Sequence, residues 1–181
     1  MATYSIISSV IIYFFISITV CHGQTLTHEE TKLYNIIMEY RATRGLPKIP
    51  LSKSLTFVAK THLKDLIKNK PDTCGCNPHS WSDRGNWTPV CYTSDHKLAE
   101  YARIKAKELT NYSGYSYEIA TKITPAHIKM TAAEAIDGFK NSPPHNAAIM
   151  NLNNWNDNEW KAIGIAIDAN YACVWFGEYE K

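Results

Sequence analysis

The stretch KAIGIAIDANYACVWFGE, residues 161–178, decides the fold class. Ile163, Ile165 and Ile167 recur at every second position, which is the side-chain period of a β-strand. Asp168-Ala-Asn170 supplies residues that favour a turn, and the apolar run after it predicts a second strand. We therefore expect a β-hairpin at this end of the chain.

Helical spacing dominates the sequence before this hairpin. Two capping boxes, Thr27-His-Glu-Glu30 and Thr131-Ala-Ala-Glu134, predict helix starts, because each satisfies backbone N–H groups that a first helical turn leaves free. Helices are also expected from Ser52 or Ser54 to near Pro71, over residues 95–109, and from Pro143 or Pro144 to Met150. A strand is expected around residues 115–120. Helices around a small antiparallel sheet predict one α+β domain.

Composition and short motifs narrow the function classes. The chain has 181 residues and a net charge of +2, with 19 basic and 17 acidic side chains interspersed. Nucleic-acid binding would require a concentrated basic stripe, so we expect none. The signatures HExxH, GxSxG and the P-loop are absent, which favours a binding protein over an enzyme. Asn86-Trp-Thr and Asn111-Tyr-Ser are candidate glycosylation sites if the source is eukaryotic.

The first residues of the chain are typical of a secretory signal. Residues 6–20 are nearly all apolar, a run shorter than the roughly 20 residues that cross a membrane. Cys21 and Gly23 occupy the small-residue positions before cleavage at Gln24. A lipidated Cys21 and an uncleaved membrane anchor are the alternatives. We expect a signal peptide over 1–23, a mature domain over 24–181 without a transmembrane anchor, and secretion from the cell.

Loss of that signal would leave four cysteines, Cys74, Cys76, Cys91 and Cys173. An even number in an exported chain indicates disulfides. Cys74 and Cys76 are too close in sequence to be a good pair, whereas Cys76–Cys91 would close a short irregular loop. We expect the Cys76–Cys91 disulfide, and the state of Cys74 and Cys173 stays open.

Four side chains are candidates for a functional site. His62 lies on the apolar stripe of the second expected helix, which favours a core histidine bonded to backbone. His79 lies in the disulfide-closed loop, where a rigid position would suit a site. Glu118 lies in an apolar strand and needs partners if it is buried. His145 lies in the first turn of a short helix. The structural alternatives are a surface-loop position for His79, a solvent-facing strand position for Glu118 and an exposed cap for His145.

Several of these segments together resemble one family. The segments NSPPHNAAIM (141–150), AIGIAI (162–167) and ACVWFG (172–177) are similar to the second half of CAP (SCP-like) domains, closest to the microbial type. Arg44-Gly-Leu-Pro47 resembles the end of the opening helix of that family. Tyr117-Glu118-Ile119-Ala120 resembles its Gly-Glu-Asn-Ile motif in altered form. The resemblance covers about residues 28–178, and residues 82–113 look like an insertion.

The resemblance implies a three-layer α-β-α sandwich with a small antiparallel sheet, export, and a cleft lined by two histidines and up to two acidic residues. It implies that His79, with His62 as its rival, converges with Glu118 and His145. A second acidic position offers Glu134 or Asp137, but its register falls on Ser142, so three ligand-type groups are expected.

Such a set could hold Zn²⁺ with an open fourth position. The first function hypothesis is a secreted protein that binds a lipid, a sterol, another small ligand or a divalent metal. The second is a metal-assisted or His/Glu hydrolase in which Glu118 is the general base. A polar cleft that holds only water is the structural alternative. The oligomeric state is left open.

Overall fold

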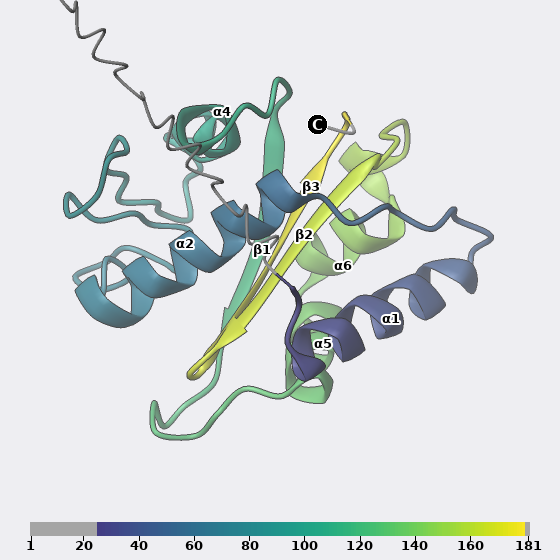
Figure 1. Cartoon of the computed structure of the whole chain (residues 1–181), viewed down its shortest axis with the longest axis horizontal. Coiled ribbons are helices and arrows are strands. Elements are labelled where there is room, and N and C mark those ends of the chain that lie inside the picture. Colours follow the sequence, from purple (N-terminus) through teal and green to yellow (C-terminus); the bar gives the residue numbers. More distant parts are fainter. Residues whose placement is uncertain (1–24, 180–181) are drawn as a thin grey trace, which may run out of the picture.

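The structure, a computed structural model, describes residues 25–179 (Figure 1). The signal peptide expected over residues 1–23 lies outside this range. Among the described helices, none has the length and apolar character needed to cross a membrane.

The sheet consists of three antiparallel strands, β1 (Ser116–Lys122), β2 (Ala162–Asp168) and β3 (Tyr171–Gly177). Their order is β1-β3-β2, so β3 is the central strand. The predicted hairpin of β2 and β3 is confirmed. On its other side β3 pairs with β1, which places Glu118 opposite Trp175. This pairing brings the middle of the chain to its last strand.

Four of the predicted helices form with the expected caps and starts. The capping boxes at Thr27 and Thr131 open α1 (His28–Ala42) and α5 (Ala132–Asn141). The Ser52 hydroxyl accepts from the Leu55 amide and opens α2 (Lys53–Asn69). Proline at the first position opens α6 (Pro143–Met150), because its ring fixes a helical φ where no N–H is needed.

The single helix expected over residues 95–109 is wrong in detail. The chain forms two short helices, α3 (Ala99–Arg103) and α4 (Lys105–Leu109), which meet at Ile104. The Lys105 side chain is fully buried, and its ammonium group donates to the Thr88 carbonyl and to Glu108. The break lets Lys105 point inward to these acceptors, a tertiary contact that local periodicity does not report.

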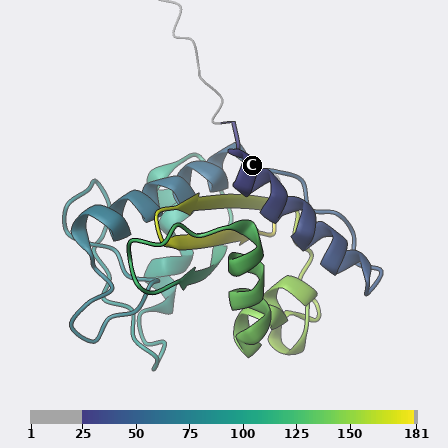
Figure 2. The same ribbon diagram turned by 90° about the horizontal axis from the view of Figure 1, so that it is seen from below.

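Helices cover both faces of the sheet, as the expected three-layer α-β-α sandwich requires. One core contains α2 with Ala162, Cys173 and Trp175, and the other contains α1, α5 and α6 with Ile163, Val174 and Phe176. Figure 2 shows the strands between α2 and the pair α5–α6. Successive residues of each strand alternate between the two cores.

The loop between α2 and α3 is held in place by two links. The predicted disulfide Cys76–Cys91 is present. Trp81 and Val90 exchange backbone hydrogen bonds of 2.8 and 2.9 Å inside the loop. These links fix His79 and Ser80 beside α2. Of the other cysteines in the described chain, Cys74 is exposed and free and Cys173 is buried and free.

Candidate functional site

Glu118 lies between two imidazoles. Its Oε1 is 2.5 Å from Nδ1 of His62 on α2, and its Oε2 is 2.9 Å from Nδ1 of His79 in the disulfide loop. The carboxylate side chain is only 3% exposed. Burial alone would raise the pKa of Glu118, but the two adjacent imidazoles outweigh burial and lower it to about 2. Glu118 is therefore a carboxylate with both oxygens hydrogen bonded.

His62 supports Glu118 from inside the core. Its ring is fully buried and stacks on Trp81 with a centroid separation of 4.2 Å. Nε2 lies 2.9 Å from the Ser80 carbonyl, so it carries a proton. Burial lowers the pKa of His62, but Glu118 and the Ser80 carbonyl outweigh burial and raise it. The expected backbone bond of a core histidine is present, and His62 also contacts the candidate site.

His145 approaches from the opposite layer, in the first turn of α6. Its ring centroid lies 5.9 Å from that of His79. Its Nδ1 is buried and has no hydrogen-bond partner among the described residues. Burial, with a smaller contribution from His79, lowers the pKa of His145 to about 4. His145 is therefore neutral near pH 7, the form that binds a metal or accepts a proton.

A pocket of about 520 Å³ opens where these side chains meet. His79, Glu118 and His145 line it, and His62 does not. The structure thus places His79, Glu118 and His145 around one pocket. The rival candidate, His62, lies outside the pocket lining and bonds Glu118. The pocket wall also includes Tyr92, His96, Arg103, Trp155 and Phe176. Tyr92, His96 and Arg103 lie in residues 82–113, and no motif in the sequence indicated any of the three.

The residues considered for a second acidic position in the cleft lie outside the pocket. Glu134 is exposed and closes the capping box of α5, and Asp137 is exposed on the same helix. Neither they nor Ser142 line the pocket. Since both oxygens of Glu118 accept hydrogen bonds from imidazoles, the free donor atoms of metal-binding type in the pocket are the imidazole nitrogens of His79, His145 and His96. The hydrogen bond to Glu118 engages Nδ1 of His79, so a metal ion would bind this ring at Nε2.

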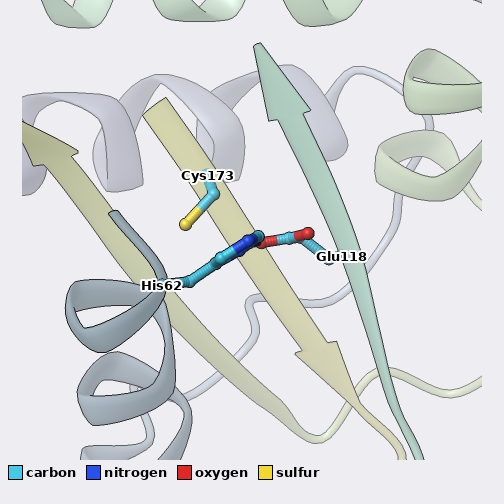
Figure 3. A group of neighbouring side chains, drawn as sticks. All are labelled: His62, Glu118 and Cys173. Atoms are coloured by element: carbon cyan, nitrogen blue, oxygen red, sulfur yellow. Dashed lines mark hydrogen bonds and ion pairs between the residues drawn. The ribbon is translucent and has the colours of Figure 1, made fainter. Parts of the chain in front are cut away.

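A second donor cluster lies beneath the pocket. Figure 3 shows the His62 ring pointing from α2 to Glu118 on β1, with the Cys173 thiol from β3 beside it. The donor atoms of these three residues lie within 4.8 Å of one another. The thiol lies 3.6 Å from the Ala59 carbonyl, and burial, reinforced by Glu118, raises the pKa of Cys173 well above its usual value. Metal ligation requires a thiolate, so the cluster fits a hydrogen-bond network better than a metal centre.

Comparison with known proteins decides the family. The model of the cysteine-rich secretory protein family, CAP, matches residues 34–175. The chain belongs to the CAP family. The resemblance found from sequence motifs is thereby confirmed. No curated protein matches this CAP chain at a significant level.

Three bacterial structures are similar to this CAP domain. An outer surface protein from Borrelia burgdorferi has 18% identity and a TM-score of 0.55, with 86% of this chain and 97% of that chain covered. An extracellular protein containing an SCP domain from Bacillus anthracis has 15% identity and a TM-score of 0.52, over 82% of this chain and 40% of that one. A cysteine-rich secretory protein from Staphylococcus aureus has 12% identity and a TM-score of 0.51, over 83% and 38%. These identities support the shared fold alone.

Proposed function

We propose that this CAP-domain chain is an extracellular binding protein whose pocket holds a divalent metal ion such as Zn²⁺ through His79 and His145. The observation that carries the proposal is the pair of neighbouring imidazoles, which meet edge to face at 80°. One is oriented by a carboxylate, and the other is neutral with an unpartnered nitrogen. Two imidazoles that share one tetrahedral Zn²⁺ at about 2.0–2.1 Å have ring centroids roughly 5 to 5.5 Å apart. The rings of His79 and His145 lie 5.9 Å apart, so a small approach of the two side chains would reach that range.

The surroundings of the pair support metal binding. Glu118 stands behind His79 in the carboxylate–histidine arrangement that raises the basicity of a metal-bound imidazole. The His79 side chain keeps 19% of its surface exposed, so an ion can reach it from the pocket. Bound metal would supply a Lewis-acidic centre with open positions for a further ligand.

Binding fits these residues better than hydrolysis. A general base must have a free oxygen within reach of water. Both oxygens of Glu118 accept hydrogen bonds, and its pKa of about 2 makes it a weak base near pH 7. The hydrolase hypothesis, with Glu118 as the general base, loses its main support on these two grounds.

Calorimetric Zn²⁺ titration of the disulfide-intact domain tests the proposal. We expect one site in the wild type, loss of at least about tenfold in affinity for His145→Ala, and no change for the exposed control His127→Ala. Glu118→Gln should weaken binding by roughly 10- to 100-fold, because it removes the carboxylate behind His79. Equal, weak binding by wild type and His145→Ala would end the metal hypothesis.

Lipid or sterol binding is the second candidate, and the apolar side of the same pocket favours it. Ile119, Pro144, Ala148, Trp155 and Phe176 line that side. A small apolar group could rest there while its polar end faces the histidines. Native mass spectrometry of protein purified from its producing cells separates the cases. Co-purified lipid supports this candidate, and co-purified metal supports the first.

A further inference from the structure

A second pocket, of about 470 Å³, lies away from the histidines. It is formed by the C-terminal end of α1, the segment that leads to α2, and the connection from α6 to β2. Figure 1 shows the end of α1 and that segment at the right of the molecule. This pocket shares no lining residue with the histidine pocket.

A buried arginine forms part of the wall. The Arg41 side chain is 1% exposed, and its Nη1 donates to the Ile149 carbonyl at 2.6 Å and to Asn151 Oδ1 at 2.7 Å. Its Nε donates to the Pro47 carbonyl at 3.3 Å. Nη2 has no acceptor among the described residues. These bonds explain why Arg41 holds α1 to the end of α6, but they leave one end of the guanidinium group unused.

The charge of Arg41 also lacks a partner. Each acceptor it contacts is a neutral carbonyl or amide oxygen, and no carboxylate of the described chain forms an ion pair with it. Burial, with no opposing charge, lowers its pKa to about 10, so it remains a cation near pH 7. A buried charge without a counter-charge is costly, and an anion in the pocket would offset that cost.

The rim of the pocket adds more positive than negative charge. Lys48 and Lys161 are both exposed there, and Glu159 is the one acid that lines the pocket. Lys161 and Glu159 are 3.4 Å apart at the surface, where such pairs are weak and open easily. With Arg41 inside, three cations face one carboxylate.

We propose that this second pocket binds a small anionic molecule through a carboxylate or phosphate group, which Arg41 Nη2, Lys48 and Lys161 recognise. Guanidinium and ammonium groups form short, charge-assisted hydrogen bonds to these oxyanions. Trp160 forms a wall of the pocket, with its indole N–H bonded to the Ala148 carbonyl. The volume leaves room for a ligand larger than the anionic group itself.

Titration with inorganic phosphate and with acetate, in metal-free buffer at constant ionic strength, tests this proposal by NMR. At least one anion should shift the signals of the Trp160 indole N–H and the Arg41 Nε–H with a saturable, millimolar dissociation constant. Binding of phosphate alone assigns the site to phosphoryl ligands, and binding of acetate assigns it to carboxylates. Failure of both to shift these two signals at tens of millimolar overturns the proposal.

Substitution of the rim separates specific binding from general attraction. Arg41→Ala would remove three structural hydrogen bonds, so the double variant Lys48→Ala/Lys161→Ala is the better test. It should weaken the anion roughly fivefold or more. The matched double variant Lys64→Ala/Lys68→Ala removes the same charge from exposed positions on α2 and should bind as the wild type does. Equal weakening in both double variants also overturns the proposal. The outcome of these anion titrations does not depend on whether His79 and His145 bind Zn²⁺.

Discussion

Burial favours the neutral form of both Glu118 and His145, but only His145 is neutral near pH 7, although both line one pocket. The Glu118 carboxylate is kept charged because two imidazoles donate to it. His145 has no such partner at Nδ1, and burial keeps it neutral. At the residue scale the site therefore combines a carboxylate that stays negatively charged with an imidazole that stays neutral near pH 7. Because of this combination, we expect the free energy of unfolding to depend on pH in a specific way.

The free energy of unfolding should fall in two steps on acidification. The pKa of His145 is lowered to about 4 in the fold, against about 6.5 when unfolded. The neutral form of His145 therefore stabilises the fold above pH 6.5. About 3 kcal/mol of the free energy of unfolding is lost as the pH falls from 6.5 to 4. Glu118, whose pKa drops from 4.5 to about 2, loses its contribution as the pH falls from about 4.5 to about 2. Denaturation of His145→Gln should lack the first step, and exposed His127→Gln should keep it. A first step of equal size in His145→Gln would contradict this assignment.

At the element scale, contact between α2 and β2 depends on one glycine. A Cβ on Gly164 would lie 2.1 Å from the Leu55 carbonyl carbon at the start of α2. We expect Gly164→Ala to lower the free energy of unfolding by at least about 2 kcal/mol, because helix backbone would have to move. Gly45→Ala is the control, since its Cβ meets open space and only its φ of +69° opposes alanine. That change should cost about 1 kcal/mol. Similar urea midpoints for both variants would show that α2 can shift freely.

The disulfide loop offers the second prediction at this scale. Cys76 and Cys91 are 15 residues apart, and the loop between them carries His79. The double variant Cys76→Ser/Cys91→Ser should lose roughly 3 kcal/mol of stability, because the unfolded chain regains the freedom that the bridge removes. Cys74→Ser, which changes an exposed free thiol, should leave stability unchanged. Guanidinium denaturation under non-reducing conditions measures both. A double variant as stable as the wild type would mean that the Trp81–Val90 bridge suffices for the loop.

At the scale of the whole molecule, local signals in the sequence predicted most of the elements. Capping boxes, proline at a helix start and period-two isoleucines each act within a few residues, so they can be read directly. The break at Ile104 and the roles within the site depend on distant contacts. Glu118 bonds His62 and His79 across 56 and 39 residues. Family motifs indicated His79, Glu118 and His145, but only the fold separates His79 from His62. No sequence pattern indicated the pocket beside Arg41, since backbone carbonyls accept most of the hydrogen bonds of that side chain.

The final prediction concerns the chain as it leaves the cell. Residues 6–20 are apolar, and small residues precede Gln24. We expect cleavage there, because a run of this length suits a signal core better than a membrane span. Export would also supply the oxidising conditions in which the Cys76–Cys91 bridge forms. N-terminal sequencing of protein from the medium should therefore begin at or near Gln24, and mass spectrometry should find the bridge intact. Recovery of the full N-terminus in the membrane pellet would instead support the uncleaved anchor, and a lipid on Cys21 would support the lipoprotein alternative.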